Sequence, residues 1–127
     1  MRDERFKLSG GLILVVVKVA EPNVTILEVT LQPGAATAEH IHTQESETIL
    51  VLEGSLEVSG RILQPGETAH LAAGTPHSFS NHGGAVVRAL FVCVPGGRER
   101  FFRAVANPDA TEASIAAAVE AAGLRFS

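Results

Sequence analysis

Three histidines and one glutamate are spaced so that they could hold a metal ion. His40 and His42 are separated by one residue, Glu47 follows them, and His77 lies in a later segment. On a β-strand, side chains two residues apart point to the same face, so His40 and His42 could act together. Imidazole suits Zn, Cu, Fe and Ni, and a carboxylate neutralises part of the ion's charge. Four such ligands on a six-coordinate ion would leave two positions for water, dioxygen or a substrate.

Most of the chain consists of short apolar segments that predict β-strands separated by turns. Residues 25–31 alternate with a period of two, which is typical of a strand. Pro-Gly pairs mark turns, and Ser59-Gly60 predicts a two-residue hairpin connection. Strands at this spacing indicate an all-β sandwich or barrel. The predicted strands cover residues 12–19, 25–31, 46–53, 56–58, 61–63, 67–71, 77–80 and 85–94.

The sequence changes character after residue 97. Residues 99–104 could form one or two helical turns, and residues 110–122 predict a helix with one apolar face. Asp109 and Glu112 are a plausible N-terminal cap pair, and Gly123 is a natural stop. We therefore expect a single domain over residues 1–127, with a barrel at about 8–95 and a C-terminal helical extension at about 98–123.

Composition excludes several classes of partner and chemistry. The chain of 127 residues carries a net charge of −4 and has neither Trp nor Tyr. Nucleic acid is therefore an unexpected partner, because single-strand binding needs stacking rings among basic residues. The negative charge also disfavours an anionic membrane surface. Without tyrosine, catalysis by a phenolic hydroxyl is impossible.

The same composition favours a cytoplasmic location. No apolar run approaches the roughly 20 residues of a membrane-spanning helix. The N-terminus shows no signal-peptide pattern. Cys93 is the single cysteine, and its apolar surroundings in the sequence predict a buried thiol. These features suit a reduced compartment.

Two stretches resemble the two conserved motifs of the cupin family. The first motif has its glycines at Gly34 and Gly54, and between them stand His40, His42 and Glu47. The second motif is matched by Gly66, Ala72, Gly74, His77 and Asn81. Ala72 stands where the family usually has proline, which affects the rigidity of a turn and no metal ligand. Together the motifs span residues 34–81.

The resemblance implies a double-stranded β-helix, or jelly-roll, barrel with a short C-terminal helix. It also implies that His40, His42, Glu47 and His77 bind one divalent transition metal ion inside the barrel. The ion could be Fe, Mn, Ni, Co, Cu or Zn, because three imidazoles and one carboxylate accept all of these. A metal-free polar cluster is the alternative, although cupins that have lost the metal usually lose ligands as well.

Ile49, Val51 and Phe79 share the inward direction of the ligands and are the predicted pocket residues. They would form an apolar wall around the metal, or else simply fill the barrel. His70 and His82 lie off the ligand pattern and are expected at the surface.

Three charged residues lie near these segments but outside the ligand pattern. Arg88 could anchor a substrate carboxylate, but a position facing solvent fits it better. Glu39 and Glu45 neighbour the metal ligands in sequence and are expected to face away or to lie in loops.

The resemblance leaves the reaction open, and we lean towards an enzyme. Residues 95–102 resemble the Pro-Gly-Gly-x-Glu-x-Phe-Phe tail of small cupins that are grouped with quercetin dioxygenases. This favours a dioxygenase-like oxidoreductase acting on an enolic or catecholic small molecule. Glu47 would serve as the catalytic base beside the metal. The alternatives are a non-catalytic cupin that senses a small ligand, and a metal-dependent isomerase or lyase.

Small cupins commonly form homodimers by pairing edge strands. The Val-rich segment 12–19 is a candidate edge, with a central strand as the alternative. Lys18 is the single charged residue on its two otherwise apolar faces, which favours burial on both sides.

Overall fold

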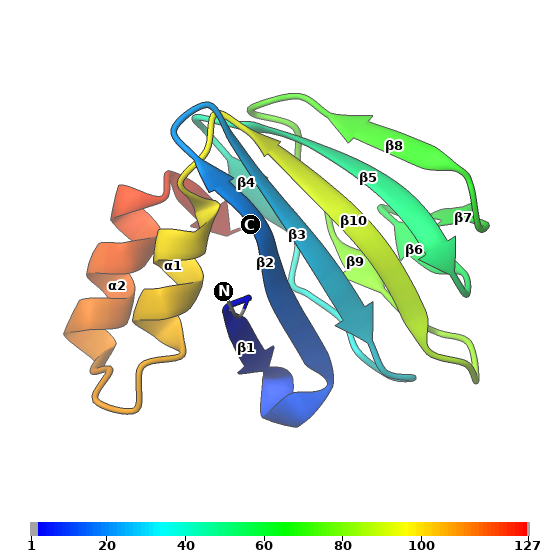
Figure 1. Cartoon of the computed structure of the whole chain (residues 1–127), viewed down its shortest axis with the longest axis horizontal. Helices are drawn as coiled ribbons and strands as arrows, with labels where there is room; N and C mark the ends of the chain where they lie inside the picture. Colours follow the sequence, from blue (N-terminus) through cyan, green and yellow to red (C-terminus); the bar gives the residue numbers. More distant parts are fainter. Residues whose placement is uncertain (1–2, 127) are drawn as a thin grey trace.

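The protein is a β-barrel made of two packed layers. The computed structural model describes residues 3–126 (Figure 1). One layer is a six-stranded antiparallel sheet with the order β1-β2-β3-β10-β5-β8. Its strands are β1 (Arg5–Leu8), β2 (Ile13–Glu21), β3 (Val24–Leu31), β10 (Val87–Val94), β5 (Ser46–Glu53) and β8 (Thr68–Leu71).

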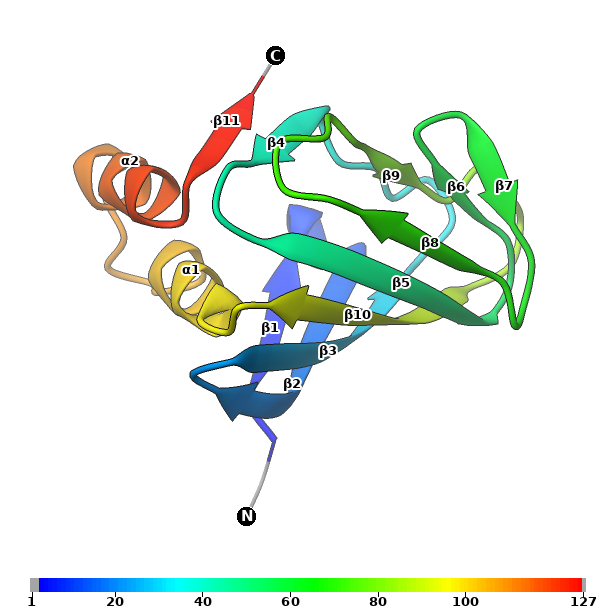
Figure 2. The ribbon, with the colours of Figure 1, turned by 90° about the horizontal axis from the view of Figure 1, so that it is seen from above.

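Two smaller sheets face this one and form the second layer (Figure 2). One has the order β7-β6-β9, and the other pairs β11 with β4. Two isolated bridges, Ala36 with Ser80 and His40 with His77, continue the pairing between them. The arrangement is the expected all-β jelly roll. The strands of this layer are β4 (His40–His42), β6 (Leu56–Val58), β7 (Arg61–Leu63), β9 (Phe79–Ser80) and β11 (Leu124–Phe126).

The core lies between the layers and follows the alternation of the strands. In β3, every second residue from Thr25 to Leu31 is buried and the residues between them are partly exposed. Leu56, Leu63 and Ile49 are completely buried. Each such side chain contributes roughly 1.5–3 kcal/mol by leaving water. The predicted alternation is confirmed, and so is the burial of Cys93, which is 0 % exposed.

Strand β2 is not an edge of the barrel, contrary to our suggestion for dimer formation. It pairs with β3 on one side and with β1 on the other. The sequence analysis missed β1, whose alternating exposed and half-buried residues give a weak apolar pattern. The edges of the large sheet are β1 and β8. The homodimer remains a prediction, but β2 is not available as its interface.

Two helices cover one end of the barrel (Figure 2). They are α1 (Arg98–Val105) and α2 (Glu112–Ala121), which pack against each other. Helix α2 begins later than predicted, and Asp109 is not its cap. Thr111 is the N-cap, and it exchanges hydrogen bonds with Ser114 in a capping box. No helix among residues 3–126 is long and apolar enough to cross a membrane.

Asn81, a residue of the second motif, fastens the loop before β10 to the end of β3. Its side chain is 1 % exposed. Nδ2 donates to the carbonyl oxygens of Leu31 (2.9 Å) and Ala85 (2.8 Å), and Oδ1 accepts from the N–H of Gly83 (3.1 Å). All the polar atoms of this amide are therefore satisfied within the protein.

We expect Asn81→Ala to lower the free energy of unfolding by about 2–4 kcal/mol, because it leaves buried backbone groups without partners. Chemical denaturation followed by circular dichroism measures this change. Asn107→Ala is the matched control, since Asn107 is exposed and bonds to one backbone N–H, that of Asp109. A loss at position 81 no larger than the control's would contradict the structural role.

Candidate metal centre

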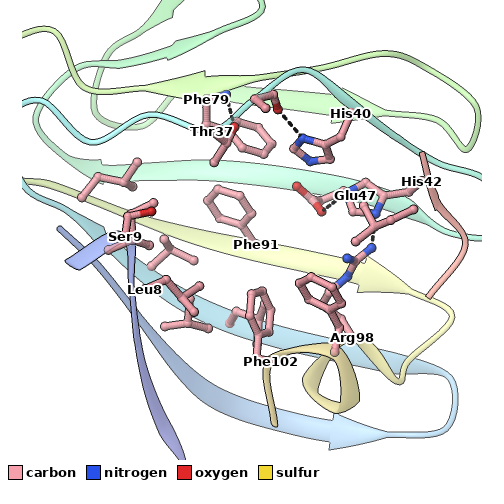
Figure 3. A pocket seen from close by; sticks show the side chains of 18 of the residues that line it. Leu8, Ser9, Thr37, His40, His42, Glu47, Phe79, Phe91, Arg98 and Phe102 are labelled. Atoms are coloured by element: carbon pink, nitrogen blue, oxygen red, sulfur yellow. Dashed lines mark hydrogen bonds and ion pairs between the residues drawn. The ribbon is translucent and has the colours of Figure 1, made fainter. Parts of the chain in front are cut away.

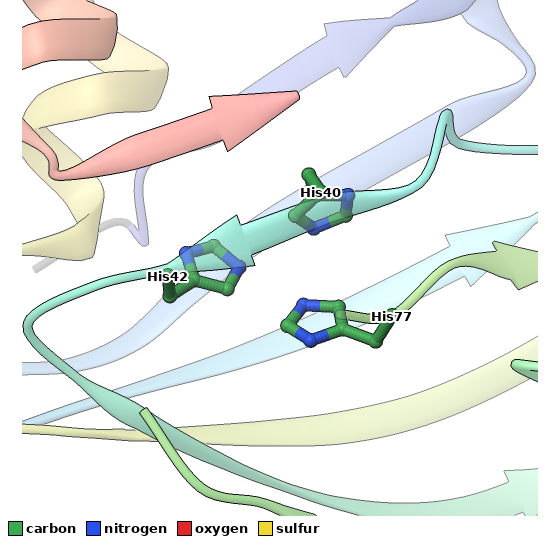
Figure 4. A group of neighbouring side chains, drawn as sticks. All are labelled: His40, His42 and His77. Carbon is green, nitrogen blue, oxygen red and sulfur yellow. The ribbon is translucent and has the colours of Figure 1, made fainter. Parts of the chain in front are cut away.

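The three predicted histidines meet inside the barrel. His40 and His42 lie on β4, and His77 faces them from the segment before β9 (Figure 4). One nitrogen from each ring lies within 4.8 Å of the others. All three residues are buried, at 9 %, 4 % and 2 % exposure. A backbone bridge causes this convergence, because the N–H of each of His40 and His77 donates to the other's carbonyl at 2.9 Å.

Backbone carbonyls orient two of the imidazoles. His40 Nδ1 lies 2.7 Å from the oxygen of Ala38, and His77 Nδ1 lies 3.1 Å from the oxygen of Thr75. A carbonyl can only accept, so the ring proton belongs on Nδ1 and the Nε2 lone pair is free. His77 Nε2 is buried without a hydrogen-bond partner among the described residues. This is the arrangement that metal-binding histidines adopt.

Glu47 supplies the carboxylate. Its Oε2 lies 3.6 Å from His42 Nε2, and its Oε1 is buried with no partner among residues 3–126. Burial raises the pKa of Glu47 to about 7, although the nearby Arg98 guanidinium opposes this. An isolated buried carboxylate is costly, and a divalent cation would compensate its charge. The residues present therefore fit a metal ion.

Burial keeps the histidines neutral. It lowers the pKa of His42 to about 2, with further repulsion from Arg98, and that of His77 to about 4, with further repulsion from His40. The pKa of His40 is also lowered, mainly by burial. Neutral imidazoles bind metal without first releasing a proton, so the site is ready to accept a cation near neutral pH.

Glu45 lies in the loop between β4 and β5, one of the two expected positions, but its carboxylate turns towards the site instead of away from it. Its carboxylate is 3.7 Å from His42 Nδ1 and accepts a 2.6 Å hydrogen bond from Arg98 Nε. Arg98 Nη2 also donates to Glu45 and faces His42 Nδ1. Arg98 is 5 % exposed. This buried pair behind His42 was not predicted. The one signal for it in the sequence is the presence of an arginine within the 95–102 tail.

A cavity of about 320 Å³ opens from the metal ligands. Figure 3 shows His40, His42, Glu47 and Arg98 gathered at one end of it, with Phe91 near the middle. Phe79 lines the cavity. Ile49 and Val51 do not line it; they are 0 % and 1 % exposed within the hydrophobic core. Their side chains point into the barrel, as expected, but they lie farther along β5, in the hydrophobic core between the two layers.

The remaining polar residues lie where the sequence places them. His70 is exposed and contacts the Thr48 hydroxyl, and His82 is exposed and lies 2.8 Å from Glu57. Arg88 lies outside the barrel and pairs with two surface carboxylates, those of Glu28 and Glu53. Glu39 is exposed in the loop before β4.

A family model of the cupin domain matches residues 27–93. The chain belongs to the cupin family. The match covers more than half of the 127 residues and includes all four predicted ligands. The fold of this cupin and its His-rich site therefore agree with the family.

Known proteins similar to this cupin include a regulator and a protein described as an isomerase. The HTH-type transcriptional regulator PuuR of Escherichia coli is 34 % identical in an alignment of 93 positions that covers 68 % of this chain. This chain spans about half the length of that relative. The structure of KdgF from Halomonas has a TM-score of 0.68 at 18 % identity and covers 76 % of this chain and 90 % of its own.

A sugar phosphate isomerase from Silicibacter pomeroyi, described as a cupin, has a TM-score of 0.64 at 23 % identity. It covers 72 % of this chain and 71 % of its own. These two structures share the fold with this cupin.

We expect one divalent transition metal ion per chain in protein expressed with that metal available. His42→Ala will lower the metal affinity at least about 100-fold, because loss of an outer hydrogen-bond partner alone costs 10–100-fold. Elemental analysis and metal titration measure this. His82→Ala, which removes an exposed histidine outside the cluster, is the control. Full metal occupancy in His42→Ala would overturn the assignment.

Glu47→Gln should have opposite effects on the metal-free and metal-bound protein. The pKa of this carboxyl is higher in the folded than in the unfolded protein. Its contribution to folding stability is therefore fully present below the unfolded pKa of 4.5 and is lost as the pH rises towards 7. Metal-free wild type should thus lose up to about 3 kcal/mol over this range relative to Glu47→Gln. Denaturation at several pH values measures the difference.

The same variant should bind metal more weakly than wild type, because an amide carries no charge. If the free energy of unfolding depends on pH in the same way in the two metal-free proteins, Glu47 is not a destabilising buried acid.

Proposed function

We propose that this cupin is a metal-dependent enzyme acting on a small molecule. The observation that carries the proposal is the position of the buried donors. His40, His42 and Glu47 lie at the end of an open, largely apolar cavity instead of in a sealed core. A structural metal site is normally closed, whereas a catalytic one remains accessible to a substrate.

The metal would supply Lewis-acid stabilisation of a substrate oxygen. Glu47 would take up a proton from the substrate, because it lines the cavity and its Oε1 has no other partner among the described residues. Phe79 and Phe91 would hold the substrate body and exclude water. Each of these roles uses a side chain at the cavity.

Within this class we propose a dioxygenase-like reaction on an enolic or catecholic substrate. Such a substrate has an oxygen that ionises beside a cation and a ring or diketone that fits between phenylalanines. The absence of tyrosine and tryptophan from the chain means that no phenol or indole can donate a hydrogen bond to it, so the metal and the other polar groups of the cavity would orient it.

A second candidate is a non-catalytic cupin that binds a small effector. The observation in its favour is the 34 % identity to a transcriptional regulator over 68 % of this chain. Such a domain would use the same cavity to bind its effector without converting it.

Oxygen consumption by the metal-loaded protein, with flavonols, β-diketones and catechols as substrates, separates these candidates. We expect aerobic loss of an enolic or catecholic compound with matching oxygen uptake. His42→Ala should abolish this uptake, and His82→Ala should retain it.

Metal-loaded protein that consumes no oxygen with any of these compounds would refute the dioxygenase reaction. Turnover without oxygen would instead indicate an isomerase or lyase. Saturable binding without turnover would indicate the effector-binding cupin.

A further inference from the structure

Arg98 places a positive charge at the metal end of the cavity. It is the one Lys or Arg side chain among the described residues that line this cavity. It lies between two spaces, because it also borders a groove that contains Glu45 on its other side. Figure 3 shows its guanidinium reaching towards His42 and Glu47. Burying a charged guanidinium costs free energy, and packing alone does not compensate that cost.

Part of the guanidinium has no partner within the protein. Nε and Nη2 donate to Glu45, whereas Nη1 makes no hydrogen bond to any described residue. Arginine has five N–H donors, and Nη1 is not among the buried atoms that lack a partner, so it is accessible from a space beside Arg98. Because Arg98 lines the cavity, Nη1 would be a donor for a ligand bound there.

Metal binding would free a second donor. A histidine that gives its Nε2 lone pair to a metal carries its proton on Nδ1, so His42 could no longer accept a hydrogen bond from Arg98. Glu45, 3.7 Å from His42 Nδ1, is the available acceptor for that proton. Arg98 Nη2 would then face the cavity without its imidazole partner. Nη1 and Nη2 together would present the planar pair of N–H donors that matches the two oxygens of a carboxylate.

The charges at this end also favour an anion. Arg98 and Glu45 compensate each other, and Glu47 compensates half of the charge of a divalent ion. One positive charge would remain at this end of the cavity. A ligand with a single negative charge would neutralise it, whereas a cation would be repelled.

The rest of the cavity selects an apolar body. Away from the metal ligands, Ser9 and Thr37 are the polar residues that line it. The remaining lining is aliphatic and aromatic. It includes Leu27, Val29, Phe79, Phe91 and Phe102.

We propose that the ligand of this cupin is a monocarboxylic acid with an apolar body, whose carboxylate is bound by Arg98 beside the metal. The proposal rests on the metal-dependent function proposed above. Glu45 holds the guanidinium in place and orients His42, and it also moderates the attraction of Arg98 for the acid.

Calorimetric titration of the zinc-loaded protein tests this, because zinc supports binding without redox turnover. The probes are 3-phenylpropanoate and 3-phenylpropanamide, which have nearly the same shape and differ in charge. We expect the acid to bind at least about tenfold more tightly than the amide, since a charged hydrogen bond is worth roughly 10- to 100-fold. Zinc content is measured on the same samples.

Variants separate the contribution of Arg98 from that of the metal. Arg98→Met should weaken acid binding about tenfold or more and leave amide binding unchanged. Glu45→Gln should strengthen acid binding, because it removes a competing carboxylate. Arg88→Met is the matched control, since Arg88 pairs with carboxylates outside the barrel and should have no effect.

The double variant Arg98→Met/Glu45→Gln covers the case in which Arg98→Met leaves Glu45 unpaired and misfolds. It removes both charges and leaves the net charge unchanged. Acid affinity equal to wild type in this variant would overturn the proposal, because the metal alone would then bind the carboxylate.

Two further outcomes in wild type are distinct from each other. Equal affinity for acid and amide at full zinc content would overturn the role of Arg98 and leave the metal-dependent function standing. Protein that binds no zinc would overturn both.

Discussion

The backbone bridge between His40 and His77 is the interaction on which the site depends. Its two 2.9 Å hydrogen bonds join the segment before β9 to β4, and they belong to the layer that faces the six-stranded sheet. The same contact that closes the barrel therefore brings the third imidazole to the first two. Because main-chain atoms form it, the convergence of the ligands does not depend on which side chains fill the cavity.

Burial is the second constraint, and it acts on every polar group of the site. Neutral imidazoles are tolerated in the core once their Nδ1 protons have carbonyl partners, as in His40 and His77. The charged groups are handled in a different way: Arg98 and Glu45 form a pair, whereas Glu47 has an unsatisfied oxygen. This asymmetry leaves Glu47 with an oxygen that a metal ion or a substrate can use.

Local patterns predicted much of this molecule. The Ser59-Gly60 turn and the alternation in β3 depend on neighbouring residues, and the structure confirms both. The pairing of Glu45 with Arg98 joins residues 53 positions apart, and no local signal specifies it. Strand β11 is three residues long and pairs with β4, so its pattern is too short to identify. The cap at Thr111 was missed because Asp109 offers a similar side chain two residues earlier.

The pairing of β11 with β4 has a practical consequence for handling the protein. Phe126 lies opposite His40 in this pairing, with their rings 6.2 Å apart, and it lines the cavity. The first described residues lie on the other side of the molecule (Figure 2). A polyhistidine purification tag fused at the C-terminal end would bring competing imidazoles next to the metal ligands. A tag at the opposite end leaves metal measurements undisturbed.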